Sequence, residues 1–233
     1  MTDMFVLPDV DEHLGMTDLA RAALAHGLAD AATDRTGHGP HAVRMVVHNA
    51  RAVAVAEGHT DPDFIERIVI TAALQDVADV KRTGDAKSGA EAARAFLIGQ
   101  GAPAAFADAV AADIASIKFQ GAHTPRRPLS AAGRIVQDAV WLASLGAIGI
   151  CRAMAYGGAI GREMYDPDLP AFYADTAEAY LAQTTTSINH LLEKAARIPD
   201  MLNTATARRI AKSRHEFLMR FLAQFTAEWE GRA

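Results

Sequence analysis

The side chains best suited to chemistry in this 233-residue chain lie at three separated places. His41 stands early in a predicted helix, and the pair Gln75 and Asp76 follows about one helix later. Asp138 lies on another predicted helix, about sixty residues further along. Imidazole and carboxylate groups can bind cations or transfer protons. Catalysis by such groups requires that the fold bring the three places together.

Each of these residues also has an ordinary structural interpretation. A histidine at a helix start often serves only as a hydrogen-bonding group. Asp76 could cap a neighbouring helix, and Asp138 could pair with Arg134 one turn earlier. Gln75 is most simply a polar residue that satisfies its neighbours. The residue types alone leave both interpretations open.

Composition and charge exclude several classes of partner. The net charge of −5 and the isoelectric point near 6.0 give no attraction to phosphate backbones or anionic lipid. The uncharged apolar run at residues 140–151 is far shorter than the roughly 20 residues that cross a bilayer. The first residues have no basic region followed by an apolar stretch. We therefore expect no nucleic-acid partner, no membrane and a cytoplasmic location.

Cysteine usage agrees with that location. Cys151 is the single cysteine, which excludes an internal disulfide and any zinc site of the Cys-x-x-Cys type. Half of the residues are hydrophobic, enough for one domain with a sizeable core.

Apolar residues recur three and four positions apart in almost every segment, which predicts an all-α protein. Asp61 and Ser130 are expected to cap two of the helices. The expected helices cover residues 40–58, with Val43, Val46, Val47, Ala50, Val53 and Ala54 buried, then 61 to the Gln75–Asp76 pair, 86–98, 103–118, and 131 to Leu142. The polar pair thus falls at a helix end.

The C-terminal part is also expected to be helical. Residues 146–158 are rich in small side chains that let helices approach closely, and residues 157–170 are expected to be irregular. Beyond them we expect a helical region that contains residues 184–190 and ends in an amphipathic helix with an aromatic stripe: Phe217, Phe221, Phe225 and Trp229. Residues 1–33 are expected as an N-terminal helical extension, and residues 34–233 as the main domain.

The spacing of His41, Gln75–Asp76 and Asp138 resembles that of the HD-domain phosphohydrolase superfamily. That family has a His, a His-Asp pair and a distant Asp, which converge from different helices on one divalent metal ion. The resemblance extends to a bacterial branch of the family and covers about residues 30–231. Further matching motifs lie at residues 135–139, 146–150, 155–158, 161–167, 187–190, 201–204 and 214–217. It implies an HD-domain helical bundle with additional C-terminal helices.

The resemblance also implies a set of site residues. It makes His41, Asp76 and Asp138 the metal ligands, with Gln75 where the family has the His of the pair. The implied substrate-binding residues are Trp141, Arg162, Tyr165, Asn189, His190 and Lys194. Their structural alternatives are core filling for the tryptophan, a turn for the Gly-rich loop around residues 162–166, and helix packing for the last three.

The departures from the family gather around the inferred site. Besides Gln75, the chain has Val140, Trp141 and Ala143 where the family has Asp, Arg and Asp. An amide oxygen binds zinc, iron, manganese or nickel less well than an imidazole nitrogen, and loss of the arginine removes a group that could pair with phosphate. We therefore expect either no metal cofactor or a weakly held divalent cation, Mg²⁺ or Mn²⁺.

Three functions fit these observations. The first, which we favour, is a protein derived from a metal-dependent phosphohydrolase with a weakened or lost divalent-metal site. The second is a metal-independent isomerase, cyclase, lyase or hydratase that uses His41 as acid–base group on an uncharged organic molecule. The third is a non-catalytic ligand-binding or scaffold pseudoenzyme. The first two imply a small-molecule substrate, and the third implies a small-molecule ligand or a partner protein. The C-terminal aromatic helix permits a homodimer.

Overall fold

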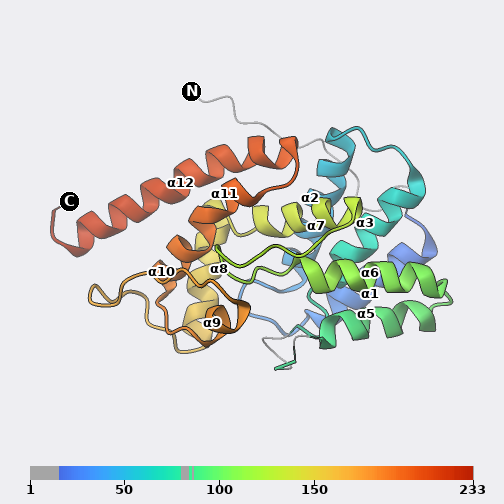
Figure 1. Cartoon of the computed structure of the whole chain (residues 1–233), viewed down its shortest axis with the longest axis horizontal. Helices are drawn as coiled ribbons and strands as arrows, with labels where there is room; N and C mark the ends of the chain where they lie inside the picture. The colour runs from blue at the N-terminus through green and yellow to red at the C-terminus, as the bar shows by residue number, and fades with distance from the viewer. Residues whose placement is uncertain (1–15, 80–83, 86, 233) are drawn as a thin grey trace. The chain divides into compact units, whose positions relative to one another are not determined.

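Residues 16–79, 84–85 and 87–232 are described by the computed structural model (Figure 1). Every regular element in these ranges is a helix, which confirms the all-α prediction. The chain divides into two compact units, described separately below. The N-terminal unit comprises residues 16–118 and 127–140 of the described chain, and the C-terminal unit comprises residues 119–126 and 141–232.

Helix α3 is the central element of the N-terminal unit. Helices α1, α2 and α6 all pack against it, and α5 packs against α6 (Figure 1). The helices of this unit are α1 (Asp18–Asp30), α2 (Pro40–Ala56), α3 (Pro62–Leu74), α5 (Ser88–Gly99), α6 (Ala104–Ile117) and most of α7 (Ala131–Leu142). The described part of the segment expected as an N-terminal extension thus contributes α1 to this core. Residues 1–15 lie outside the described residues, and the division at residue 33 stays a prediction.

Helix starts in this unit follow the expected capping chemistry. Proline occupies the first turn of α2, and the Asp61 carboxylate caps α3 by accepting from the backbone N–H of Asp63 at 3.3 Å. All six residues of the predicted α2 stripe are buried. In α3, Ile68, Val69 and Ala72 are buried, whereas Phe64 and Ile65 are only half-buried because they lie in the first turn.

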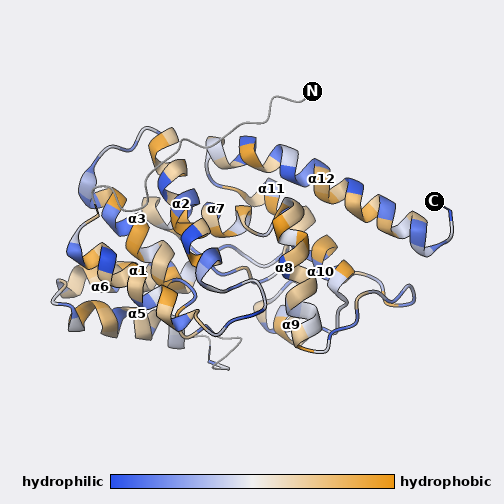
Figure 2. Cartoon of the chain, turned by 180° about the vertical axis from the view of Figure 1, so that it is seen from behind, coloured by the Kyte–Doolittle hydropathy of each residue, from blue (hydrophilic) through white to orange (hydrophobic). Residues whose placement is uncertain are grey.

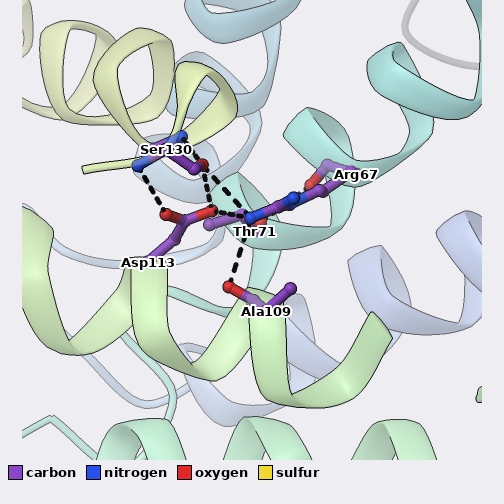
Figure 3. A network of polar contacts seen from close by, with 6 residues as sticks. Arg67, Thr71, Ala109, Asp113 and Ser130 are labelled. Carbon is purple, nitrogen blue, oxygen red and sulfur yellow. Dashed lines mark hydrogen bonds and ion pairs between the residues drawn. The ribbon is translucent and has the colours of Figure 1, made fainter. Parts of the chain in front are cut away.

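A charged network joins α3 to α6 and to the start of α7 (Figure 3). The guanidinium Nη2 of Arg67 lies 2.6 Å from Oδ2 of Asp113 and donates to the Ser130 hydroxyl at 3.1 Å. Ser130 donates to the same carboxylate at 2.8 Å and accepts from the Gly133 N–H at 3.0 Å, so it caps α7 as expected. A Cβ at residue 133 would lie 2.5 Å from Asp113 Oδ1, so glycine is required there.

Helix α8 is the scaffold of the C-terminal unit and packs against α10 and α12. A Cβ at Gly157 would lie 2.1 Å from Ser187 Oγ, so the small residues of α8 do permit close approach. Figure 2 shows largely apolar residues along α8, whereas polar and apolar residues alternate along α12. The unit contains α8 (Gly146–Ala159), α9 (Ala177–Ala182), α10 (Ser187–Glu193), the short 3₁₀ helix η1 (Ala195–Arg197), α11 (Ile198–Met201) and α12 (Ala205–Trp229).

The carboxylate of Glu193 holds the irregular segment between α8 and α10. It is 3% exposed and accepts hydrogen bonds from the Phe172 N–H at 2.9 Å, from Gln183 Nε2 at 2.9 Å and from the Thr185 hydroxyl at 2.8 Å. These donors come from both sides of α9. A segment that lacks long helices is thereby fixed to α10 by a buried anion with satisfied oxygens.

No single helix in the described ranges is long and apolar enough to cross a bilayer. Only α7 and α8 taken together reach that length and composition, and they are separated by a break and a bend.

The Arg67–Asp113 pair should contribute much more to stability than an exposed pair on the same helix. We expect Asp113→Ala to lower the free energy of unfolding by roughly 2–3 kcal/mol, because it leaves a largely buried guanidinium without its carboxylate. The matched control is Asp108→Ala, which removes the exposed partner of Arg94 and should cost less than about 1 kcal/mol. Urea unfolding followed by circular dichroism measures both, and equal losses would contradict the assignment.

Candidate functional site

Four of the predicted site residues belong to the N-terminal unit. His41 is the second residue of α2 and is exposed, whereas Gln75, the C-cap of α3, is only 3% exposed. Asp76 follows in the turn after α3 and is half-buried. Asp138 lies on α7 and is fully buried. The polar pair therefore stands at a helix end, as predicted.

The ammonium group of Lys118, directly after α6, lies against this pair. Its Nζ donates to the backbone carbonyl of Gln75 at 2.7 Å and to Oδ1 of Asp76 at 2.9 Å. It also donates to Oδ2 of Asp79 at 2.7 Å, and a longer contact of 3.4 Å reaches Oε1 of Gln75. The position beside the candidate ligand Asp76 is thus taken by a cation that belongs to the chain itself.

The electrostatics of this cluster keep Lys118 charged. Burial by itself lowers the pKa of the Lys118 ammonium, but attraction to Asp76 and Asp79 and the hydrogen bonds to both carboxylates outweigh it and raise the pKa above its usual value. At neutral pH the charged Lys118 ammonium therefore lies between the acidic side chains of Asp76 and Asp79. The backbone carbonyl of Gln75 adds the negative end of the α3 dipole.

The turn that carries these acids has a strained backbone. Ala78 has φ of 47°, in the left-handed region that favours glycine. The Ser88 hydroxyl, at the start of α5, donates to the Ala78 carbonyl at 2.7 Å. The turn is thus held from two sides, by Ser88 and by Lys118. Strain of this kind tends to gather where a structure fixes functional groups.

The described side chains are not arranged as a transition-metal centre. In the ranges that the structure describes, no group of three or more His, Cys, Asp or Glu side chains is arranged to hold a metal ion. Catalytic zinc sites use three protein ligands. Of the three implied ligands, His41 is exposed and Asp76 is paired with Lys118. The geometry therefore does not fit such a centre, and a loosely held Mg²⁺ or Mn²⁺ stays a prediction.

Lys118 and Asp79 were missed by sequence reasoning. A lone lysine after a helix is common on protein surfaces, and it is 42 residues away from Asp76 in the sequence. Asp79 carried a weak signal, since it places a second carboxylate one turn after the polar pair. Only the packing of α3 against α6 brings the three side chains together.

Trp141, Lys194 and Arg162, three of the predicted substrate-binding residues, lie beside aromatic rings of the C-terminal unit. The ring of Phe119 is 6.0 Å from the Trp141 ring and 5.2 Å from the Tyr180 ring, both in edge contact. The Lys194 ammonium lies 5.6 Å from the centre of the Phe119 ring. Trp141 is 3% exposed, so in this unit it fills core space rather than offering a free face.

Arg162 lies beside another aromatic ring of the same unit. Its guanidinium is 5.9 Å from the centre of the Tyr156 ring. Burial raises the pKa of the Tyr180 hydroxyl, an effect that the charge of Arg162 partly offsets and that of Glu193 reinforces. Arg162 and Lys194 thus bring two positive charges to a group of aromatic rings, a combination that suits an aromatic or anionic ligand.

The other three candidates have structural contacts. Tyr165 packs edge-on against Phe225 and Trp229 of α12, with ring centres 5.4 and 5.1 Å apart. Asn189 is buried and donates to the Leu169 carbonyl at 2.8 Å. His190 is half-buried in the last turn of α10. Tyr165 therefore packs on the aromatic stripe of α12. Asn189 anchors the loop that contains Leu169.

Comparison with known proteins identifies relatives along most of the chain, although no protein-family model matches it. The sequence is 32% identical over 200 residues to the uncharacterized protein YpgQ of Bacillus subtilis (strain 168), which covers 85% of this chain and 87% of the relative. A crystal structure from Lactobacillus plantarum superposes with a TM-score of 0.84 and 32% identity, covering 93% of this chain and 99% of the other.

Two further structures bear on the fold. The crystal structure of YpgQ in complex with ADP gives a TM-score of 0.67 at 24% identity, over 92% of this chain and 100% of that one. This identity is lower than that of the sequence alignment because superposition pairs positions by space, and it supports the fold alone. An HD-superfamily hydrolase from Bacillus thuringiensis gives a TM-score of 0.64 at 30% identity, covering 91% of this chain and 96% of the other. The chain, all-helical and related along nearly its whole length to that hydrolase, belongs to the HD superfamily.

Proposed function

We propose that this protein derives from a metal-dependent phosphohydrolase and has a weakened or lost divalent-metal site. The observation that carries this proposal is the contact between the Lys118 ammonium and Gln75, Asp76 and Asp79. In the family pattern, the Gln75–Asp76 position is a His-Asp pair that binds the metal ion. Here one ligand is an amide, and the other already neutralises a lysine.

Metal-assisted phosphate hydrolysis depends on charge at the ion. A divalent ion activates water and neutralises the phosphoryl oxygens, and an arginine or lysine commonly assists it. An ammonium group supplies one positive charge instead of two and cannot polarise a bound water in the same way. Among the described residues, the single positive charge of Lys118 is shared by two carboxylates, so this lysine has little charge left to offer a phosphate. Ordinary metal-dependent turnover is therefore impaired.

The geometry supports the two alternative functions to different degrees. A metal-independent enzyme with His41 as its acid–base group needs Asp76 or Asp138 to orient the imidazole. Oδ1 of Asp76 accepts a hydrogen bond from Lys118, and Asp138 is fully buried whereas His41 is exposed. A non-catalytic ligand-binding protein agrees with the geometry as well as an impaired hydrolase does. The two are distinguished by turnover.

We also infer that the ligand is a nucleotide or a chemically similar aromatic phosphate. YpgQ, a relative at 32% sequence identity, has been crystallised with ADP. In the C-terminal unit of this chain, Arg162 and Lys194 stand beside Tyr156 and Phe119. Cationic groups beside aromatic rings suit a ligand that combines a planar base with phosphate.

Metal content is the direct test of the proposed function. Protein purified without chelator or nickel affinity resin should contain far less than one equivalent of zinc, iron, manganese or nickel by inductively coupled plasma mass spectrometry. Soaking in these ions followed by gel filtration should leave the content unchanged, because Asp76 remains paired with Lys118. Near one equivalent of tightly held metal, together with metal-dependent hydrolysis of nucleotides, would overturn the proposal.

Nucleotide binding should be measurable without added metal. We expect ADP to raise the melting temperature, and Lys194→Ala to weaken ADP binding about tenfold in isothermal titration calorimetry, a loss typical of one charge-assisted phosphate contact. The matched control is Lys212→Ala on an exposed position of α12, which should leave the affinity unchanged. Equal affinities for all three proteins would exclude Lys194 from the ligand site, and no shift with ADP would reject this ligand class.

A further inference from the structure

The substitution at Gln75 does not by itself account for the altered site. A hard cation could still bind a carboxylate and an amide oxygen together with several waters. What prevents this approach in the described geometry is the position of the Lys118 ammonium, within 3.4 Å of every polar side chain in the turn from Gln75 to Asp79.

We propose that Lys118 is a tethered cation that keeps the Asp76 position closed to divalent metal ions. This inference rests on the proposed function and adds the residue that enforces it. The closure depends on the charge of Lys118. The replacement of the family's histidine by Gln75 contributes less to the loss of metal binding.

The contacts of Nζ are those of a built cation site. An ammonium has three hydrogens to donate, and it has three short acceptors: the Gln75 carbonyl, Asp76 Oδ1 and Asp79 Oδ2, at 2.7, 2.9 and 2.7 Å. All three acceptors are oxygen atoms, the ligand type that hard cations prefer. Each hydrogen thus has a partner, and the lysine satisfies the acids that a metal ion would otherwise satisfy.

The surrounding helices direct Lys118 into this position. Helix α6 ends at the fully buried Ile117, and Lys118 leaves the helix in an extended conformation with φ of −65° and ψ of 140°. Gln137 Nε2 donates to the Ile117 carbonyl at 3.3 Å, which satisfies an acceptor freed by the end of α6. Because α6 packs against α3, the lysine stem begins beside the C-terminal end of α3.

Charge explains why lysine and metal exclude each other. A divalent ion bound to an Asp76 oxygen would lie about 2.0–2.2 Å from it. The ammonium lies 2.9 Å from Oδ1 of the same carboxylate, so two cations would meet at short range in a partly buried setting. Binding of the ion therefore requires displacement of Lys118, which then loses three hydrogen bonds. Removal of the charge removes both penalties.

The test compares Mn²⁺ binding among four proteins by isothermal titration calorimetry, with manganese electron paramagnetic resonance as a second readout. The proteins are the natural chain, Gln75→His, and the double variants Gln75→His/Lys118→Gln and Gln75→His/Lys118→Arg. We expect Gln75→His alone to bind no more than about threefold tighter than the natural chain. Gln75→His/Lys118→Gln should bind at least about tenfold tighter, whereas the arginine variant, which retains the charge, should stay closed.

Each outcome has a separate meaning. If Gln75→His alone binds Mn²⁺ as tightly as the lysine-to-glutamine double variant, the inference about Lys118 is wrong while the proposed function stands. If the arginine variant opens the site, charge is not the cause and the inference also fails. If the folded lysine-to-glutamine double variant binds no better than the natural chain, Lys118 does not close the site. One equivalent of tightly bound metal in the natural chain would instead reject the proposed function.

Discussion

The hydrogen bonds of the Lys118 ammonium determine the properties of the whole turn after α3. They neutralise two carboxylates, bind the C-cap carbonyl of that helix and hold a turn whose backbone contains a left-handed alanine. Because one group meets all of these requirements, the turn can be ordered without an external cation. In a metal-dependent hydrolase, the bound ion would supply both the order of the site and its chemistry. Here the order of the turn does not depend on a bound ion.

Two ion pairs join α3 and α6, and each helix or its end supplies one of the two cations. Arg67, in the middle of α3, pairs with Asp113 on α6, and Lys118, directly after α6, pairs with Asp76 in the turn after α3. Both cations lie partly out of water, where an unpaired charge is costly, so each contact specifies how the two helices align. The candidate site lies at one of these two contacts.

The predictable features of this chain are local, and the features that sequence reasoning missed are not. Apolar spacing and capping residues located α2, α3 and α7, because a helix start depends on neighbours within four positions. The burial of Trp141 follows from its size. By contrast, the Lys118–Asp76 pair spans 42 residues and the Arg67–Asp113 pair 46, so no periodicity reports them. The family pattern implied His41, Asp76 and Asp138 as ligands, but it could not reveal a lysine beside one of them.

The contact between Gly157 and Ser187 bears on how such a chain can change over evolutionary time. A Cβ at residue 157 would lie 2.1 Å from Ser187 Oγ, so any side chain at this position requires the serine hydroxyl to move while α8 and α10 remain packed. Ligand positions at a turn have no comparable steric restriction, and a lysine can restore the charge balance that a lost ion leaves behind. Selection for folding alone thus preserves the scaffold and leaves the chemistry free to diverge. A lineage can then retain every packing motif of a hydrolase after its original reaction has ceased to matter.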